Sequence, residues 1–335
     1  MYRNYTTILE YLWLDGTGNR RSKTRIVKYD ILKIDEIPIW NCDGSSTGQA
    51  NSDGNTEVIL VPSKYFFNPL LNPNAVNCNS FIVLCETFDI NMVPLPSNHR
   101  SKAVKIFNKG LAEEPWFGIE QEYIMIHKND TECLEGRHYC GTQLNSIERT
   151  VAEEHMTACL KADIKYAGLN SEVTLSQWEY QVGPCEGIEA ADHLTVANFL
   201  LERIAEKHNV VISYHPKLYP DKNGTGCHTN FSTSRTRCED GIEEIHNCME
   251  KLKYKHTKHI EVYGEANDMR LTGIHETSSY NQFSFGIGTR NTSARIPTQV
   301  EKDGCGYFED RRPAANCDPY QVTSIIFQTC CLEEI

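Results

Sequence analysis

The sequence predicts a two-domain protein of mixed α+β structure, with a small, mostly β domain over residues 1–95 and a larger mixed domain over residues 96–335. A chain of 335 residues allows about two domains, because single domains average ~150 residues. Short strand-like runs fill the first part, whereas strand-like and helix-like segments alternate irregularly in the second.

Four runs in the first part have the composition of strands and are separated by Gly, Asn and Pro clusters. They are "EYLWLDG" (10–16), "TRIVKYDIL" (24–32), "TEVILVP" (56–62) and "NSFIVLC" (79–85). The stretch "MVPLPSNHR" (92–100) contains two prolines and is the predicted linker. Ser97 is the candidate N-cap of the helix that follows it.

Three helices are predicted in the second part from apolar spacing and capping. Two of them carry amphipathic stripes, formed by Leu194, Ala197, Leu201, Ile204 and Ala205 and by Ile242, Ile245, Met249 and Leu252. In the third, Asn145 followed by Glu148 indicates a capped start of a helix that runs through Cys159. The stripes are interpreted as core faces.

Composition excludes several classes of protein. The net charge is −12 and the basic residues are scattered, which argues against nucleic-acid binding. The longest purely apolar run, "FIVLC", is far shorter than the ~20 residues of a membrane span, and the start lacks a secretory signal pattern. None of the 14 cysteines are spaced C-x-x-C, so reduced thiols in the cytoplasm are expected. There is no dinucleotide-binding or P-loop glycine motif.

The stretch "WFGIEQEYIMIH" (116–127) places two carboxylates on one face of a predicted strand. In an extended chain Glu120 and Glu122 point to the same side, together with Trp116, Ile124 and Ile126. Like charges this close repel, and burial of even one costs several kcal/mol or forces the group to take up a proton. A positive group is therefore expected between them.

Further candidate donors occur in aromatic or glycine-rich contexts. Glu172 and Glu179 lie in and beside the strand "QWEYQVG", on which Gln177, Glu179 and Gln181 share the face opposite Trp178, Tyr180 and Val182. His228 follows the glycine-rich "NGTGC", and Glu309 lies in "GYFEDRRP". Taken singly, each has an ordinary interpretation: a solvated carboxylate, a hydrogen-bonded histidine, or a surface pair of Glu309 with Arg311 or Arg312.

The accumulation of five carboxylates and one imidazole favours a metal site. Oxygen donors with few nitrogens suit Mg²⁺ or Mn²⁺, in two or three sites that bridge phosphates. Four arginines, Arg270, Arg290, Arg295 and Arg311, supply guanidinium forks for anionic oxygens. Metals and arginines without a P-loop indicate phosphoryl transfer at a non-standard nucleotide site.

Six blocks of the sequence together resemble the signature blocks of class II, eukaryotic-type glutamine synthetase. They are "DGSSTGQ", "PWFGIEQEY", "QWEYQVGPCEGI", "NGTGCHTNFST", "RLTGIHETSS" and "GYFEDRRPAANCDPY", in family order over residues 9–332. The resemblance implies an α+β fold: an N-terminal β-grasp domain, then a catalytic domain with a curved antiparallel sheet flanked by helices. It also implies a homo-oligomer, a decamer of two pentameric rings with active sites between adjacent subunits.

The resemblance assigns roles to residues, position by position. Ligands of a first metal are Glu122, Glu172 and Glu179, and ligands of a second are Glu120, His228 and Glu309. Substrate-binding positions are Asn223, Gly224, His228, Arg270, Arg290 and Arg311. ATP-binding positions are Glu120, Glu179, Asn230, Phe231, Ser232, Arg290, Arg295 and Tyr307. Catalytic positions are Asp43, Glu276, Arg290 and Arg311.

The implied reaction is the ATP-dependent ligation of ammonia to the γ-carboxylate of L-glutamate through γ-glutamyl phosphate. Two other readings remain: a ligase that uses another amine, and a structural relative without activity. Asp43, which would hold ammonium, favours ammonia, and retention of all six metal ligands disfavours the structural role. The sequence departs from the common family pattern at its short N-terminus and between residues 127 and 148.

Overall fold

The structure is a computed structural model that describes residues 5–71, 78–127, 138–142 and 147–333. Contacts between Cα atoms divide the chain into two compact units. Unit 1 comprises residues 1–102 with residues 157–164, and unit 2 comprises residues 103–156 and 165–335.

Unit 1 contains a five-stranded sheet in the order β2-β1-β5-β4-β3. Its strands are β1 (Thr6–Leu14), β2 (Arg20–Val27), β3 (Trp40–Asp43), β4 (Glu57–Phe67) and β5 (Cys78–Phe88). The central strands β1 and β5 run parallel, and the other pairs are antiparallel. Each of the four predicted runs overlaps a strand, although β1 ends at Leu14 and β2 at Val27, so the ends of the first two runs lie outside. Strand β3 has only 4 residues and was not predicted.

The helix after the linker has a different cap from the predicted one. Helix α1 (His99–Phe107) begins directly after Asn98, whose side-chain oxygen accepts a hydrogen bond from the Ser101 amide at 3.1 Å. The prediction of Ser97 as the cap is therefore wrong, because the cap side chain must stand immediately before the first helical residue. The Ser97 hydroxyl instead accepts a hydrogen bond from the Gln49 side chain at 3.1 Å.

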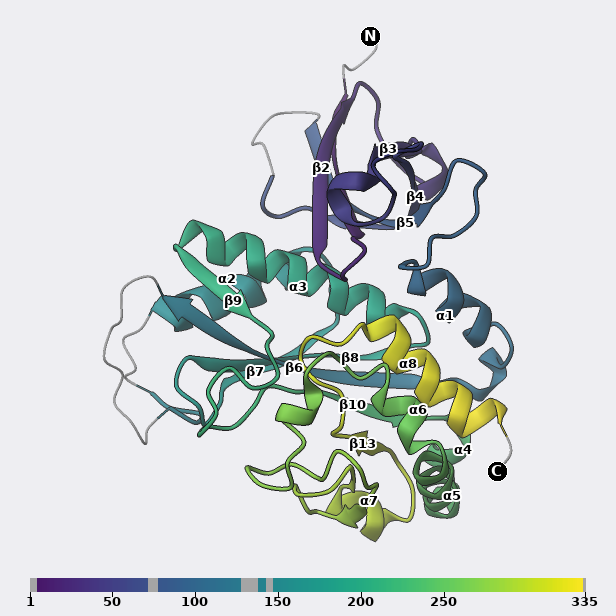
Figure 1. Ribbon diagram of the computed structural model, residues 1–335, viewed down its shortest axis with the longest axis vertical. Helices are drawn as coiled ribbons and strands as arrows, with labels where there is room; N and C mark the ends of the chain where they lie inside the picture. The colour runs from purple at the N-terminus through teal and green to yellow at the C-terminus, as the bar shows by residue number, and fades with distance from the viewer. Residues whose placement is uncertain (1–4, 72–77, 128–137, 143–146, 334–335) are drawn as a thin grey trace. The chain divides into compact units, whose positions relative to one another are not determined.

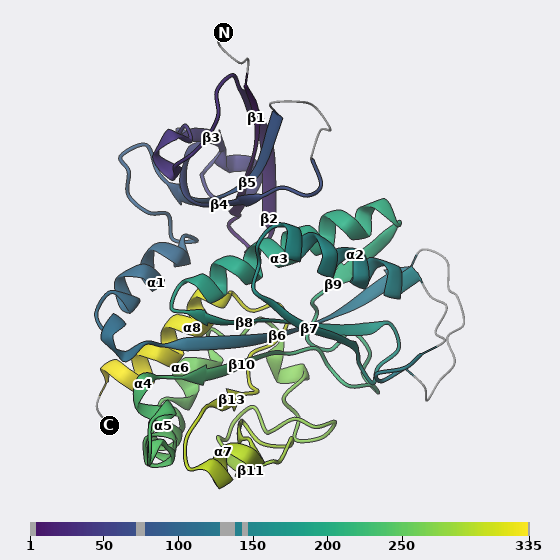
Figure 2. The same ribbon diagram turned by 180° about the vertical axis from the view of Figure 1, so that it is seen from behind.

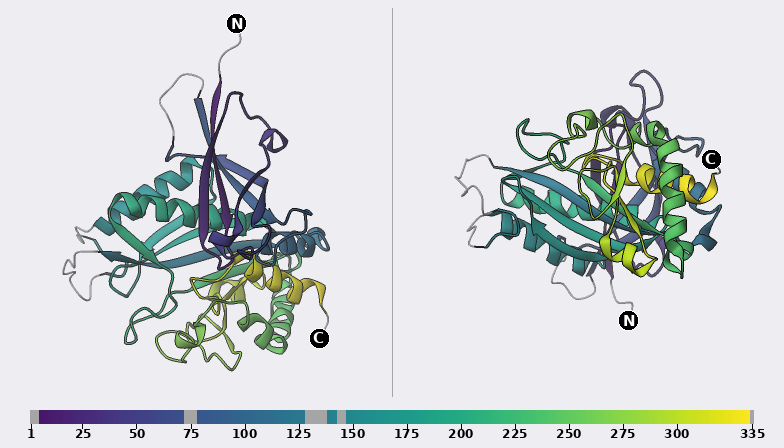
Figure 3. Two further views of the ribbon diagram at one scale, coloured as in Figure 1. Left: turned by 45° about the horizontal axis from the view of Figure 1, so that its top comes forward. Right: turned by 90° about the horizontal axis from the view of Figure 1, so that it is seen from below.

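Unit 2 is built on an eight-stranded sheet in the order β11-β12-β13-β10-β6-β8-β7, with β9 paired to β6. The sheet is strongly curved (Figure 3). All pairs are antiparallel except β11 with β12. The strands are β6 (Trp116–His127), β7 (Tyr166–Ser171), β8 (Gln177–Glu186), β9 (Val210–Ser213), β10 (Cys227–Ser232), β11 (Phe285–Ile287), β12 (Ala294–Ile296) and β13 (Phe308–Asp310).

The α-helices that follow α1 in the described residues are α2 (Ile147–Lys161), α3 (Glu189–Lys207), α4 (Ser234–Arg237), α5 (Gly241–Tyr254), α6 (His256–Ile260), α7 (Thr298–Asp303) and α8 (Pro319–Phe327). Helix α3 packs on β6, β8 and β9 and against α8. The segment 261–307, which carries β11 and β12 at one edge of the sheet, lies on the side away from α3 (Figures 1 and 2). The predicted stripes of α3 and α5 are confirmed as core faces, except that Ile242 is only partly buried. Helix α2 runs through Cys159 as predicted, but its proposed cap Asn145 lies outside the described residues.

The two faces of β8 explain how acidic side chains come to lie in a pocket. Trp178, Tyr180 and Val182 are buried, and the Tyr180 hydroxyl donates to Asn198 of α3 at 2.8 Å. Because side chains alternate along a strand, Glu179 points away from α3. The predicted division of this strand into an apolar and a polar face is confirmed.

None of the helices in the described ranges is long and apolar enough to cross a membrane. The cysteines that the structure describes are all free thiols.

Candidate active site

The polar face of the unit 2 sheet lines a cavity of about 220 Å³, which we call the acidic pocket. It brings together all six predicted metal donors, Glu120, Glu122, Glu172, Glu179, His228 and Glu309. Seven further predicted residues also line it: Asn223, Gly224, Arg270, Glu276, Arg290, Arg295 and Arg311. Residues as far apart in the sequence as Glu120 and Arg311 thus share one cavity.

Strand register produces this convergence. Glu122 on β6 stands directly opposite Glu179 on β8, and Glu120 stands opposite His228 on β10. On the next strand pair Glu309 is the register partner of Arg295. The antiparallel order therefore sets the donors side by side across four neighbouring strands, on the face that α3 does not cover.

His228 is the centre of the donor cluster. Its Nδ1 atom lies 3.6 Å from a Glu120 oxygen, 3.8 Å from a Glu122 oxygen and 3.6 Å from a Glu309 oxygen. Glu120, His228 and Glu309 each offer one ligand atom, and these atoms lie within 4.8 Å of one another. Separations of this size leave room for one cation between the three side chains.

The carboxylate of Glu122 is fixed by neighbours that the sequence did not single out as site residues. One of its oxygens accepts hydrogen bonds from the Gly226 amide at 2.7 Å and from the Gln177 side chain at 2.9 Å. Gly226 is required here, because an added Cβ would lie 2.6 Å from the His228 Nε2 atom. The period-2 pattern of β8 put Gln177 on the face of Glu179, which is the signal that could have found it.

Burial and mutual repulsion perturb the ionisation of the acidic pocket. Burial, followed by the charge of Glu172, raises the pKa of Glu122 to about 8. Burial, followed by the charges of Glu120 and Glu122, raises the pKa of Glu179 to about 9. Burial, together with the charge of Arg311, lowers the pKa of His228 well below its usual range, so its imidazole is neutral and free to act as a ligand.

The donor set fits hard divalent cations. Raised pKa values in a carboxylate cluster mean that negative charge there is incompletely compensated by the protein. A bound divalent cation is the group that would stabilise the deprotonated carboxylates. The donors are carboxylate oxygens with a single imidazole nitrogen, which suits Mg²⁺ or Mn²⁺ better than zinc.

Two arginines compensate Glu309 inside the pocket wall. Arg311 donates to one Glu309 oxygen at 2.6 Å, and Arg295 lies 3.4 Å from the other. Arg312 does not take part, because it forms a fully buried pair with Asp310 at 2.7 Å. Of the two surface pairs considered from the sequence, only Glu309–Arg311 exists, and it is buried. Arg270 is buried as well and donates to the carbonyl oxygens of residues 311, 312 and 313.

The segment around Glu276 closes one side of the acidic pocket. His275 and Glu276 both have left-handed backbones, with φ of 55° and 61°, a conformation that costs non-glycine residues of order 1 kcal/mol or more each. Half of the Glu276 side chain is exposed, and its carboxylate lies 3.8 Å from the Arg290 guanidinium. Arg311, which directly follows β13, donates to the Glu276 carbonyl at 3.5 Å and to the Arg290 carbonyl at 3.1 Å, so one guanidinium contacts both residues.

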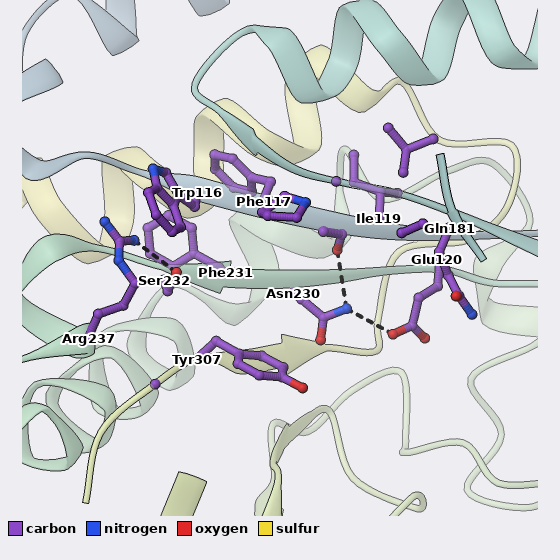
Figure 4. A pocket seen from close by; sticks show the side chains of 16 residues that line it. Trp116, Phe117, Ile119, Glu120, Gln181, Asn230, Phe231, Ser232, Arg237 and Tyr307 are labelled. Atoms are coloured by element: carbon purple, nitrogen blue, oxygen red, sulfur yellow. Dashed lines mark hydrogen bonds between the residues drawn. The ribbon is translucent and has the colours of Figure 1, made fainter. Parts of the chain in front are cut away.

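An aromatic pocket of about 410 Å³ (Figure 4) adjoins the acidic pocket, and Glu120 and Gln181 line both. It contains the four remaining nucleotide candidates, Asn230, Phe231, Ser232 and Tyr307. Asn230, which lines the aromatic pocket, donates a hydrogen bond at 2.8 Å to Glu120, which lines both pockets. Arg237 stacks on the Trp116 ring at 3.8 Å and donates to Ser232 at 3.0 Å.

Asp43 belongs to unit 1 and is not among the residues that line either pocket. It caps the short helix at Gly44–Thr47 by accepting hydrogen bonds from the Ser45 amide and hydroxyl at 3.0 and 2.8 Å. These hydrogen bonds lower the pKa of the exposed Asp43 carboxyl. The side chain is therefore an anion that faces solvent.

Several pocket residues had no place among the predicted site residues. Tyr139, Asn170, His275, Thr277 and Gln181 line the acidic pocket, and Trp116 and Arg237 line the aromatic one. Gln181 shares the polar face of β8 with Glu179, so the alternation of that strand indicated it. Trp116 shares a face of β6 with Glu120, so the alternation of that strand indicated it as well. No periodic pattern marks the others, since their positions follow from turns and from contacts between distant segments.

Comparison with known proteins matches residues 100–260 to the glutamine synthetase catalytic domain. A putative glutamine synthetase of Acanthamoeba polyphaga mimivirus is 50% identical, with 97% of this chain and 94% of that protein covered. The glutamine synthetase of Emericella nidulans is 46% identical (97% and 93% covered), and a cytosolic isozyme of Pinus sylvestris is 45% identical (96% and 93% covered). Identity of this extent over nearly the whole chain shows that the protein belongs to the glutamine synthetase family, in its eukaryotic type.

Proposed function

We infer that this chain is a glutamate–ammonia ligase, which joins ammonia to the γ-carboxylate of L-glutamate and converts ATP to ADP and phosphate. Membership of the glutamine synthetase family supports this activity. The structural observation that carries it is the junction of an acidic pocket, which holds six metal donors and four arginines, with an aromatic pocket. The phosphates of ATP and the two carboxylates of glutamate are assigned to the first pocket, and the nucleoside to the second.

The six donors divide into two metal sites in this proposal. Glu122, Glu172 and Glu179 hold the first divalent ion, and Glu120, His228 and Glu309 hold the second. When bound, such ions neutralise the negative charge that keeps a carboxylate and a triphosphate apart. The chain's own part is to orient the ligands through the strand register and through hydrogen bonds such as that from Gly226 to Glu122.

The nucleotide lies with its adenosine in the aromatic pocket and its phosphates toward Glu120. Asn230, Phe231, Ser232 and Tyr307 line the adenosine part. Arg290 and Arg295 line the acidic pocket, where they bind the phosphate that is transferred. Glutamate is held by Asn223, Gly224, His228, Arg270 and Arg311, whose donors suit its two carboxylates.

Transfer requires activation, because a carboxylate does not expel oxide. The γ-carboxylate of glutamate attacks the γ-phosphorus of ATP, ADP leaves, and γ-glutamyl phosphate forms. Arg290, Arg295 and Arg311 stabilise the negative charge that develops on the transferred group. Ammonia then attacks the acyl carbon and phosphate departs. The segment that bears Glu276 excludes water, which would otherwise hydrolyse the acyl phosphate.

Ammonium has no lone pair and must lose a proton before it attacks. Asp43 is an exposed anion in unit 1, and its role is to bind ammonium and take that proton. We place it at the acidic pocket of an adjacent subunit in a decamer of two five-membered rings. The proposal locates the enzyme in the cytoplasm, with Mg²⁺ or Mn²⁺ as its metal.

Product analysis tests the choice of nitrogen donor. The full chain is incubated with ATP, Mg²⁺, L-glutamate and ¹⁵N-ammonium, and in parallel with a panel of organic amines. The expected result is glutamine labelled in its amide nitrogen, with ADP and phosphate in equal amounts. Products formed only with organic amines would instead identify a γ-glutamyl ligase of another substrate class.

A further inference from the structure

A second cluster of ionisable side chains, one carboxylate and two imidazoles, lies in unit 2 outside the acidic pocket. Glu148, in the first turn of α2, lies between the imidazoles of His127 and His138. The Nε2 atom of His127 is 3.0 Å from one Glu148 oxygen, and that of His138 is 3.6 Å from the other. Glu148 and His138 are each only 4% exposed. A carboxylate buried to this degree is tolerated only with close partners, so the three side chains act as a unit.

His138 links this cluster to the backbone of a proposed metal ligand. Its Nδ1 atom lies 2.6 Å from the carbonyl oxygen of Glu172, while its Nε2 atom faces Glu148. Two further hydrogen bonds join the same segments: the Ser171 hydroxyl donates to the His138 carbonyl at 2.5 Å, and the Cys140 amide donates to the Ser171 carbonyl at 3.0 Å. Hydrogen bonds thus join residues 138–140 to residues 171–172.

Glu172 needs such support because it lies just beyond the end of β7, which finishes at Ser171. Its amide donates to the Gln177 carbonyl at 2.8 Å, and its carboxylate accepts from Asn170 at 2.8 Å. Its carbonyl oxygen is outside the strand ladder and is the atom that His138 contacts.

The first turn of α2 holds the same segment at a second point. Arg149 donates to the Gly141 carbonyl at 2.6 Å. Tyr139 lies between His138 and Gly141, the residues that these contacts hold. It lines the acidic pocket and forms a hydrogen bond with Arg290. The helix therefore anchors a stretch of pocket wall on either side of Tyr139.

We propose that Glu148 and His138 are positioning residues, which hold the Glu172 backbone so that its carboxylate stays directed into the acidic pocket. This role rests on the proposed function, in which Glu172 binds a divalent cation. Neither residue is among those that line the acidic pocket, so each acts on it through Glu172. Partners behind metal ligands commonly contribute about 10–100-fold to metal affinity.

The test compares two matched substitutions on α2. Glu148→Gln keeps the shape of the side chain and removes its charge. Glu154→Gln removes the partner of another histidine, His208 at 2.9 Å, on the solvated side of the same helix, where the carboxylate is 49% exposed. Each full-length variant is titrated with Mn²⁺ alone, and free Mn²⁺ is followed by electron paramagnetic resonance.

We expect Glu148→Gln to weaken Mn²⁺ binding by about 10-fold and Glu154→Gln to match the unsubstituted protein. In the glutamine assay the half-activating metal concentration should rise by the same factor, with kcat restored at saturating metal. A purely structural role would lower the fraction of folded protein and leave the affinity of that fraction unchanged. Mn²⁺ binding by folded Glu148→Gln equal to that of the unsubstituted protein overturns the positioning role.

A pair of variants at position 138 gives a second test that remains decisive if Glu148→Gln does not fold. His138→Asn retains an amide that can donate to the Glu172 carbonyl, whereas His138→Ala does not. The asparagine variant should bind Mn²⁺ more tightly than the alanine variant, and equal affinities contradict the link to Glu172. A chain with no substitution that binds no Mn²⁺ and makes no glutamine would overturn the proposed function itself, which separates the two failures.

Discussion

Glu122 and Glu179 stand directly opposite each other on neighbouring antiparallel strands, and both side chains are buried. Like charges in this arrangement destabilise a sheet. When both carboxylates are deprotonated, their repulsion therefore lowers the stability of the metal-free fold, and a cation bound between them would offset it.

Stability of the metal-free protein should fall as pH rises. Folding raises the pKa of Glu122 to about 8 and that of Glu179 to about 9, mainly through burial. The folded state holds these protons after the unfolded chain has released its own near pH 4.5, so their contribution is full below that value and is lost as pH rises through 8 to 9. Thermal denaturation in EDTA should show a lower Tm at pH 9 than at pH 6, and excess Mn²⁺ should reduce the difference. Parallel Tm curves with and without metal would contradict this explanation.

Glu122→Gln should weaken the dependence of activity on divalent metal, because the first site loses one charged ligand. Since partners behind ligands already contribute about 10-fold, loss of a ligand should raise the half-activating metal concentration by at least that factor. Glu206→Gln is the control, because its carboxylate is 69% exposed on α3. The placement of Glu122 fails if both variants give the metal titration curve of the parent protein.

Glu276→Ala should leave ATP binding largely intact and sharply lower glutamine formation. The side chain is half exposed and touches Arg290 but lies outside the aromatic pocket, so the adenosine contacts are unaffected. Loss of the closing segment should raise the ratio of phosphate released to glutamine formed, since water reaches the acyl phosphate. Both products are measured in one assay, with the exposed Glu265→Ala as the control. A normal yield of glutamine would show that the assignment of Glu276 is wrong.

Gly224→Ala should destabilise the protein by about 1–3 kcal/mol, the usual cost of an overpacked site. An added Cβ at Gly224 would lie 2.3 Å from the Pro216 carbonyl oxygen and 2.6 Å from Arg270 Cγ. Arg270 would have to shift, so the KM for glutamate should rise as well. Gly54→Ala is the matched control, because an added Cβ there meets nothing within 4 Å. Denaturant unfolding measures the difference, and equal stability of the two variants would contradict the tight fit.

Much of the architecture could be predicted from local patterns. The stripes of α3 and α5 and the two faces of β8 follow from periodicities of 3.6 and 2 residues, which the core enforces. Strand β3 escaped prediction because four residues carry too little pattern. The cap of α1 was missed by one residue, since Ser97 and Asn98 are both good caps and only the backbone decides between them.

Only part of the acidic pocket could be predicted from the sequence. The residue types of Glu120, Glu122 and His228 indicated metal binding, and the family resemblance supplied their grouping. Which residues support them is a matter of register and of distant contacts, as with the Gly226 amide that holds Glu122. Glu148 lies in the first turn of α2, His127 ends β6, and His138 precedes a short turn. No spacing in the sequence predicts that these three residues meet.

The central claim is that the six donors of the acidic pocket hold divalent cations. Anomalous diffraction from crystals grown with Mn²⁺ and an ATP analogue tests this claim most directly. We predict one peak within coordination distance of Glu122, Glu172 and Glu179, and a second beside Glu120, His228 and Glu309. An acidic pocket without anomalous peaks at saturating Mn²⁺, or peaks that lie only elsewhere on the protein, would contradict the account.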